Sequence, residues 1–332
     1  MFPFLFSTTE FAVNYQPRDF IETHDGLIFA VVDGLPEDDR VLCFLRYAPI
    51  GGKLAKMGTD QANAYLQSRA PRYLFLSERL DARLHAVPLA DIRRHYRPRE
   101  RVRELLNSEP RDEIERKAVS LLQKFGALGV EIGRIGLTGS LLIGVQTPKS
   151  DLDFVIYGRK AFFEARDIVG RLIGSGELQE LNDAAWRDAY DRRGCALGFE
   201  EFLRHERRKL NKAMIGGTKF DITLIAEPLS MESGPVRKLG PILIRAEVAD
   251  AACAFDYPAR YRLNHAEFAE AVSFTHTYAG QALAGETVEI SGLLEESPSG
   301  KRRIVVGSSR EASGEYIKVV SWANSPHPDR QT

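Results

Sequence analysis

Cysteines are few in this sequence and a long apolar run is missing, and each absence excludes a class of protein. The three cysteines, Cys43, Cys195 and Cys253, are widely separated and never in CxxC spacing, which argues against a disulfide framework and a structural zinc site. No stretch approaches the ~20 consecutive apolar residues of a transmembrane helix. The apolar start MFPFLFSTTEFAV lacks the basic region and cleavage site of a signal peptide. We therefore expect a soluble protein of the reducing cytoplasm that has no membrane partner.

An excess of charge of either sign is also missing. The 332 residues include 45 Lys and Arg and 46 Asp and Glu, so a site for a polyanion must come from local clustering of charge. The seven histidines show no HxxxH or HxxEH arrangement, and the chain contains neither a GxSxG nor a GxxxxGK[ST] motif. A zinc enzyme, a serine hydrolase and a Walker-type nucleotide site are therefore unsupported.

The residue patterns divide the chain into three sections and a tail. We expect an N-terminal α/β section at 1–107, a central section at 108–234, a C-terminal section at 235–324 and a disordered tail at 325–332. The first section predicts strands at 27–32, 41–47, 72–76 and 83–87 and helices at 60–69, 90–96 and 98–108. Short strands between Gly, Pro and Ser in the C-terminal section predict a small closed or half-open β-barrel, for which an OB-like fold is one candidate.

The central section mixes helices and strands. Ser108, Pro110 and Asp112 favour a helix start. The apolar residues that follow at helical spacing are Ile114, Ala118, Leu121, Leu122 and Phe125. Later patterns predict strands at 134–138, 151–157 and 218–226 and helices at 160–173, 177–192 and 199–214. The fold class expected for the whole chain is α+β.

Two acidic residues, separated by one residue, stand in DLDFVIYG, which otherwise reads as a buried strand. Alternation puts Asp151 and Asp153 on one face of that strand. Neighbouring carboxylates repel unless a cation lies between them, and Mg²⁺ or Mn²⁺ accepts such oxygen ligands together with substrate phosphates. In TKFDITLI, Asp221 shares a face with Lys219, and pairing of the two strands would complete a two-metal site. We predict that Asp151, Asp153 and Asp221 bind metal and carry the chemistry.

The pair Gly139-Ser140 could supply a phosphate site. A strand that ends in Gly-Ser and turns into a helix can offer backbone N–H groups and a hydroxyl to a triphosphate, and glycine permits close approach. Ser140 lies 11 residues before Asp151, directly after an apolar strand. That position makes the combination more specific than a Gly-Ser pair alone. Lys149 and Ser150 are further nucleotide-binding candidates.

The chain resembles the motif pattern of the DNA polymerase β-like nucleotidyltransferase superfamily over about residues 110–226. The elements that carry the resemblance are LTGS, the 11-residue spacing from Gly-Ser to the first aspartate, DLDFVIYG and FDITLI. The resemblance implies a core of a mixed sheet with helices. It also implies that Asp151 and Asp153 bind both metals and that Asp221 helps to bind the catalytic metal and activates the acceptor hydroxyl. The chain also resembles archaeal-type predicted nucleotidyltransferases over most of its length. This second resemblance includes the segments HYRP, ERRKLN and HTYAGQA. Many superfamily members carry an arginine shortly after Gly-Ser, where this chain has leucine and isoleucine.

Basic residues outside these motifs leave two interpretations open. The helix expected at 199–214 would align Arg204, Arg208 and Lys212, either as a contact for triphosphate or nucleic acid or as a solvated face. The basic run at 93–103 has the same alternatives. In the C-terminal section the barrel either binds nucleic acid or uses its aromatics as core. The basic and aromatic residues concerned are Arg302, Arg303, Arg310, Lys318, Tyr257, Tyr261, Tyr278, Tyr316 and Trp322.

These patterns predict an enzyme that uses two Mg²⁺ or Mn²⁺ ions to transfer an NMP unit from an NTP such as ATP to a hydroxyl acceptor, releasing pyrophosphate. The acceptor expected first is an RNA 3′ end, and a small molecule or a protein hydroxyl is the alternative. A nucleotide- or RNA-binding module without turnover is a further alternative. Such a module would not need three converging carboxylates.

Overall fold

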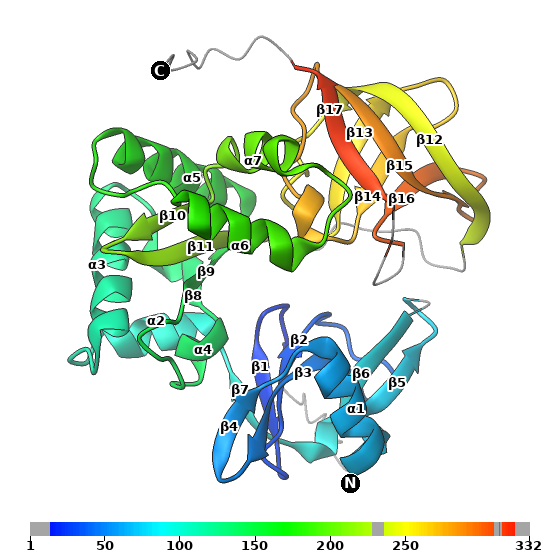
Figure 1. Cartoon of the computed structure of the whole chain (residues 1–332). Coiled ribbons are helices and arrows are strands. Elements are labelled where there is room, and N and C mark those ends of the chain that lie inside the picture. Colours follow the sequence, from blue (N-terminus) through cyan, green and yellow to red (C-terminus); the bar gives the residue numbers. More distant parts are fainter. Residues whose placement is uncertain (1–13, 81, 228–235, 309–311, 313, 323–332) are drawn as a thin grey trace, which may run out of the picture. The chain divides into compact units, whose positions relative to one another are not determined.

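The computed structural model describes residues 14–80, 82–227, 236–308, 312 and 314–322. The chain forms two compact units, Met1–Pro98 and Arg99–Thr332, which we describe separately. Both contain helices and strands (Figure 1), which confirms the α+β class. The apolar N-terminal stretch, Arg310 and the tail predicted to be disordered lie outside the described residues. Within these residues, no helix combines the length and the apolarity that crossing a membrane requires.

The first unit is built on a seven-stranded antiparallel sheet of order β5-β6-β3-β2-β1-β7, with β4 paired to β3. Its strands are β1 (Phe20–Thr23), β2 (Ile28–Val31), β3 (Arg40–Ile50), β4 (Lys53–Lys56), β5 (Leu74–Ser77), β6 (Ala82–Pro88) and β7 (Ile92–Tyr96). The helix α1 (Thr59–Arg69) buries Ala62 and Leu66 in the core of this unit. The short 3-10 turns η1 (Pro71–Tyr73) and η2 (Leu89–Asp91) connect the strands. The helix at 60–69 and the four predicted strands are confirmed.

The helix predicted at 90–96 is wrong, because most of that segment is strand β7. This strand pairs with β1. Two side chains hold it there: the Tyr96 hydroxyl donates to Glu22 at 2.6 Å, and His95 Nε2 lies 2.7 Å from an oxygen of Asp19. These partners are more than 70 residues away in the sequence, so local periodicity could not report them.

The second unit centres on a four-stranded sheet of order β10-β11-β9-β8. Its strands are β8 (Ile135–Leu137), β9 (Leu152–Tyr157), β10 (Lys212–Ile215) and β11 (Thr218–Ile225). The pair β9 and β11 is parallel, and the other two pairs are antiparallel. Gly216 and Gly217, with φ of +51° and +77°, form the two-residue turn that joins β10 to β11, a conformation that favours glycine.

The helical elements of this unit pack on this sheet or on the strands that follow it in the chain. They are α2 (Pro98–Leu106), α3 (Glu113–Ala127), the 3-10 turn η3 (Ile132–Arg134), α4 (Gly139–Leu142), α5 (Arg159–Gly174), α6 (Asp183–Arg193) and α7 (Phe199–Arg207). The helix α3 begins as predicted, because Asp112 accepts a hydrogen bond from the backbone of Glu115 at 2.9 Å. Its predicted apolar face is buried, and Phe125 meets Phe154 of β9 edge to face.

The buried face of the sheet fixes where its polar face lies. α3 and α5 share one core with the even-numbered residues of β9 and β11, among them Leu152, Phe220 and Ile222. Side chains alternate along a strand, so the odd-numbered residues Asp153 and Asp221 project from the opposite face. Both side chains are partly exposed there.

The helix predicted at 199–214 is too long. α7 ends at Arg207, Leu210 has a φ of +50°, and β10 begins at Lys212. A positive φ at leucine ends a helix. The helix predicted at 177–192 also differs, since α6 begins at Asp183 after an Asn182 cap.

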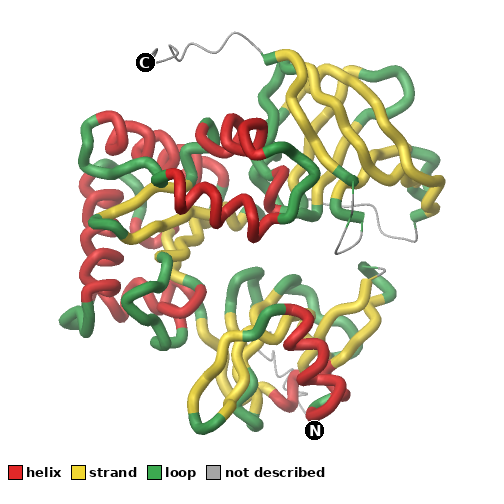
Figure 2. The backbone as a smooth tube through the Cα atoms, viewed as in Figure 1, coloured by secondary structure: helices red, strands yellow, loops and turns green. Residues whose placement is uncertain are grey.

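Six strands form the C-terminal part of this unit (Figure 2). They are β12 (Arg237–Asp250), β13 (Ala259–Asn264), β14 (Glu270–Ser273), β15 (Thr287–Glu296), β16 (Arg302–Val306) and β17 (Tyr316–Ser321), with the 3-10 turn η4 (His276–Tyr278) between β14 and β15. The order β12-β13-β14-β16-β15 closes through the pairing of β12 with β15, and β17 is attached to β15. A closed β-barrel, as predicted, is confirmed. Gly292 permits the close approach of two strands, because a Cβ there would stand 2.4 Å from the carbonyl oxygen of Val305.

Candidate active site

Strand pairing brings two of the predicted carboxylates together. β9 and β11 run parallel with Asp221 directly opposite Asp153, and both side chains are on the face that the helices α3 and α5 leave uncovered. Asp151 lies two residues before Asp153, just ahead of β9, and is also partly exposed. Directly opposed residues on one face have Cβ atoms roughly 5 Å apart, so the two aspartates form an acidic pair.

The Gly-Ser turn lies against this acidic pair. β8 ends before Thr138, whose backbone N–H donates to the carbonyl of Asp153 at 2.9 Å. Gly139 then begins α4 with a φ of +68°, and a Cβ at this position would stand 2.3 Å from Oδ2 of Asp153. Only glycine leaves room for that carboxylate. Ser140 follows, partly exposed, and because α4 has only four residues, the turn can offer individual N–H groups but little helix dipole.

A lysine neutralises one of the acidic groups. The Lys219 ammonium lies 3.0 Å from Oδ2 of Asp151, and the two side chains are 13% and 36% exposed. Lys219 lies two residues before Asp221, so it projects from the same face of β11. Sequence reasoning placed Lys219 on this face but assigned it no partner, because the partner, Asp151, lies just ahead of another strand.

Divalent metal ions fit the donor chemistry of this face. Asp153 and Asp221 offer hard oxygen ligands on adjacent strands, which is what Mg²⁺ and Mn²⁺ accept. Within the described ranges, no three His, Cys, Asp or Glu side chains form a cluster ready to hold a metal, and the ion pair with Lys219 occupies an oxygen of Asp151. Asp151 could join as a ligand by exchanging this ammonium for a metal ion.

The loop before β9 holds two further predicted residues. Ser150 closes a turn with Thr147: each backbone N–H donates to the other residue, Ser150 N to the Thr147 carbonyl and Thr147 N to the Ser150 hydroxyl, both at 2.9 Å. Lys149 is exposed in this turn, two residues before Asp151 in the chain. The turn therefore delivers a solvated cation to the start of the acidic strand.

The predicted basic row does not exist as a row, because α7 ends before two of its three members. Arg208 donates to both oxygens of Glu286, at 2.7 and 2.9 Å. The Arg204 guanidinium stacks 3.9 Å from the ring centroid of Trp322, and Lys212 donates to Glu206 at 2.5 Å. These contacts give each of the three side chains a partner within the second unit, and Arg204 is exposed beside Trp322.

A buried charge cluster, which sequence reasoning missed, connects β10 to the barrel. Glu206, whose side chain is 3% exposed, pairs with Lys209 and Lys212. Lys209 is 2% exposed and donates to the carbonyl of Thr277 at 2.8 Å. Burial alone would raise the pKa of Glu206, but the two ammonium groups hold it well below its usual range. The motifs ERRKLN and HTYAGQA therefore meet in space, which their letters alone could not indicate.

The aromatic and basic residues of the barrel are mostly engaged internally. Tyr261 and Tyr278 are buried, and their hydroxyls donate to backbone carbonyls. The cations Arg302, Arg303 and Lys318 all form ion pairs with glutamates. Of the two interpretations for these tyrosines, the structure supports the core.

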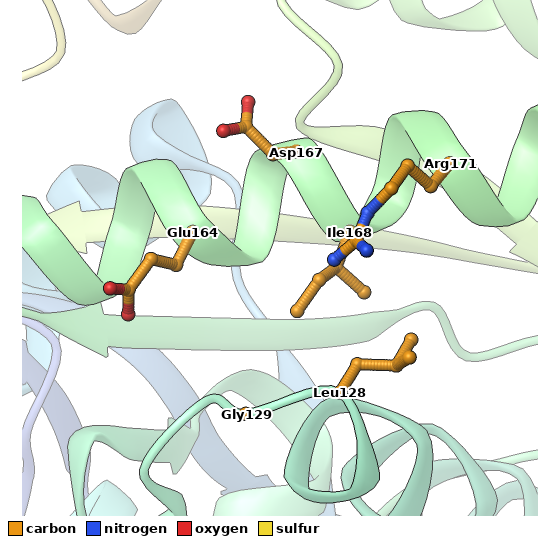
Figure 3. Close-up of a pocket in the computed structure, with 6 residues that line it drawn as sticks. All are labelled: Leu128, Gly129, Glu164, Asp167, Ile168 and Arg171. Atoms are coloured by element: carbon orange, nitrogen blue, oxygen red, sulfur yellow. The ribbon is translucent and has the colours of Figure 1, made fainter.

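A groove of about 450 Å³ lies on the far side of the sheet from the carboxylates (Figure 3). Leu128 and Gly129, which follow α3, line it together with Glu164, Asp167, Ile168 and Arg171 of α5. Figure 3 shows the Asp167 carboxylate pointing away from Leu128. The groove has no constellation of converging polar groups, so it is not the candidate site.

Comparison with known proteins agrees with this geometry. A family model described as nucleotidyltransferase domain matches residues 115–210, a span that includes the Gly139 turn, Asp151 and Asp153. The chain is 37% identical over 336 residues to the uncharacterized protein MJ1086 of Methanocaldococcus jannaschii, and the alignment covers 91% of this chain and 98% of that protein. No solved structure matches the chain. The chain therefore belongs to the nucleotidyltransferase-domain family of the polymerase β-like superfamily.

Proposed function

We propose that this protein transfers an NMP unit from an NTP, such as ATP, to a hydroxyl acceptor with the help of two Mg²⁺ or Mn²⁺ ions. One observation carries the proposal: Asp221 is in register with Asp153 on neighbouring parallel strands, and Asp153 lies against the backbone of Gly139. The carboxylates are suited to bind metal ions, and the glycine turn beside them leaves room for phosphate groups. This arrangement suits a metal-dependent transfer of a phosphate group.

In this proposal Asp151, Asp153 and Asp221 hold the metal ions. When bound, divalent ions neutralise phosphate charge and favour the ionised form of the acceptor hydroxyl. The backbone of Gly139, the Ser140 hydroxyl and the turn with Lys149 and Ser150 face the triphosphate.

The bond changes of the proposed reaction are an in-line exchange at phosphorus. The acceptor oxygen bonds to the α-phosphorus, and the bond from that phosphorus to the pyrophosphate oxygen breaks. The hydroxyl proton passes to the carboxylate of Asp221, and pyrophosphate leaves with the electron pair of the broken bond.

The acceptor that we propose first is an RNA 3′ end. Tyr257 is 46% exposed and stacks on His276 at 4.9 Å with an angle of 24° between the rings, a surface on which a base can stack. An OB-like use of the barrel would add to this contact. The glutamate partners of Arg302, Arg303 and Lys318 favour the second candidate, a small-molecule or protein hydroxyl, because paired cations attract a polyanion weakly.

Labelled nucleotides separate these possibilities. Purified protein is incubated with each α-labelled NTP, Mg²⁺ or Mn²⁺ and total RNA, in parallel with Asp153→Asn and with Asp167→Asn. Asp167 is exposed on α5, on the covered side of the sheet, so its variant is the matched control. We expect label on RNA from the wild type and the control but not from Asp153→Asn. Label on protein would move the acceptor to a protein hydroxyl, and RNA binding without label would identify a binding module instead.

A further inference from the structure

The proposed reaction needs positive charge near the pyrophosphate that leaves, because negative charge develops there as the bond to phosphorus breaks. The segment after Gly139-Ser140 supplies none: Leu141 and Leu142 are buried and Ile143 is partly buried. The Lys219 ammonium is engaged with Asp151. A cation from another element would add to the positive charge that the metal ions and Lys149 bring to the triphosphate.

Arg111, just before α3, places a guanidinium at the loop that follows α4. Its Nη2 lies 3.4 Å from the point where a Cβ on Gly144 would stand. Gly144 has a φ of +71° and carries no side chain, so the guanidinium lies directly against the loop backbone. The Arg111 side chain is 59% exposed, which leaves it accessible to a ligand in solution.

A buried glutamate fixes the orientation of this guanidinium. Glu115, 1% exposed, accepts from the backbone N–H of Arg111 at 2.8 Å and from its Nε at 2.9 Å. Burial alone would raise the pKa of Glu115, but the hydrogen bonds from Arg111 and the nearby charge of Arg101 lower it to about 2. A planar fork anchored at one edge presents its other edge in a defined direction. Nη1 of Arg111 forms no hydrogen bond with the part of the chain that the structure describes.

The same glutamate is connected to the Gly-Ser turn itself. Arg101, on α2, donates to Glu115 at 2.6 Å through Nη2 and to the carbonyl of Leu141 in α4 at 2.8 Å through Nε. One buried carboxylate thus holds two guanidinium groups, one under α4 and the other beside the loop that follows it. Glu104, 3.3 Å from Arg101, is 62% exposed, so its charge is largely screened by solvent. Arg101, Arg111 and Glu115 together carry one net positive charge, and the carboxylate of Asp112, next to Arg111 in the chain, opposes it.

We propose that Arg111 binds the terminal phosphates of the NTP and the departing pyrophosphate, as the cation that the segment after Gly139-Ser140 lacks. This assignment rests on the proposed nucleotidyltransferase function and adds a substrate contact to it. Glu115 and Arg101 act as positioning residues, since they touch Arg111 and α4 rather than the substrate.

The test measures binding of inorganic tripolyphosphate in the presence of Mg²⁺ by calorimetry, together with binding of AMP. Arg111→Gln is compared with Arg116→Gln. Arg116 is 58% exposed and pairs with a glutamate on the same helix, so its variant removes an equally solvated charge. We expect Arg111→Gln to weaken tripolyphosphate binding by roughly 10-fold or more, since a hydrogen-bonded contact between charges is lost. Arg116→Gln should change it less than about twofold, and AMP binding should be unchanged in both.

A second variant and a second readout complete the test. Arg111→Lys keeps the charge and loses the fork, so its tripolyphosphate affinity should lie between those of the wild type and Arg111→Gln. Equal tripolyphosphate affinities in the wild type, Arg111→Gln and Arg111→Lys would overturn the assignment, while transfer of label by the wild type would leave the proposed function standing. A wild type that neither binds tripolyphosphate nor transfers label would overturn both.

Discussion

Replacement of Glu206 by glutamine should destabilise the second unit strongly at neutral pH. The change keeps the size of the side chain and one acceptor oxygen, but it removes the only negative charge between Lys209 and Lys212 that the described hydrogen bonds provide. The ammonium of Lys209 would then be buried without a counter-ion. Removal of one partner from a buried ion pair costs about 3–5 kcal/mol, and the retained hydrogen-bond acceptor places the expected loss near the lower end.

The loss should also depend on pH in a defined direction. Burial lowers the pKa of Lys209 to about 8 even though Glu206 opposes the shift, and without Glu206 the pKa falls further. Between the folded pKa and the ordinary lysine value of 10.5 the unfolded chain binds more protons, so stability rises with pH. In the variant this rise begins at a lower pH than in the wild type. The difference between the two proteins should therefore be smaller at pH 9 than at pH 7.

Urea unfolding followed by tryptophan fluorescence measures both effects. The two tryptophans of the chain, Trp186 and Trp322, belong to the second unit, so the signal reports on it. The control is Glu113→Gln, because Glu113 is 59% exposed and pairs with an equally exposed arginine; its loss should stay below about 1 kcal/mol. Equal losses in the two variants, or a Glu206→Gln loss that does not shrink with pH, would refute the reasoning.

Three further predictions concern the site. Lys219→Met removes the ammonium that faces the carboxylates and should raise Mn²⁺ affinity several-fold by calorimetry; unchanged or weaker affinity would contradict the role assigned to this ion pair. Gly139→Ala and Gly158→Ala should each lower the free energy of unfolding by about 1 kcal/mol, because both positions have positive φ. Only Gly139→Ala, whose Cβ would meet Asp153, should abolish label transfer. The pKa of Glu115 is about 2 against an ordinary 4.5, so its charge stabilises the fold above pH 4.5 and the benefit is lost as pH falls towards 2. In urea titrations Glu115 should contribute about 3 kcal/mol to the stability lost in that window, so Glu115→Gln should lose clearly less than the wild type.

Local patterns were sufficient to predict elements whose partners need not be known. The start of α3 follows from Asp112 as its cap, and its buried face follows from helical spacing. The strands of the barrel follow from short apolar runs between turn residues. In these segments propensity, periodicity and burial agree, and the sequence alone then predicts the structure.

The errors fall where a distant partner outweighs the local pattern. Residues 212–215 continue the helical spacing of α7, yet they pair with β11 across the Gly216-Gly217 turn. Residues 92–96 pair with β1 in the same way. In both cases the segment pairs with a neighbouring strand, whose backbone groups would lack these hydrogen bonds if the segment were a helix. The neighbouring strand is identified only in the folded chain.

The candidate site shows the same division. Alternation alone put Asp151 and Asp153 on one face, but their position opposite Asp221 depends on the register of two strands about 70 residues apart. The partner of Asp151, Lys219, could not be predicted, because that contact joins separate elements. Glu115 lies only four residues after Arg111, but its second partner, Arg101, belongs to another helix. Residue types therefore indicated the chemistry, and non-local contacts determine which charged groups are available to a substrate.

The buried charge cluster suggests why the barrel and the nucleotidyltransferase core belong to one compact unit. Lys212 lies opposite Asp221 in the sheet and shares Glu206 with Lys209, which in turn donates to the barrel at Thr277. Separation of the barrel would expose this carboxylate and its two ammonium groups to water and would remove the partner of Lys209. Because β10 carries one of those ammonium groups next to the acidic strand, the barrel contributes to the rigidity of the site even though its own cations are paired with glutamates.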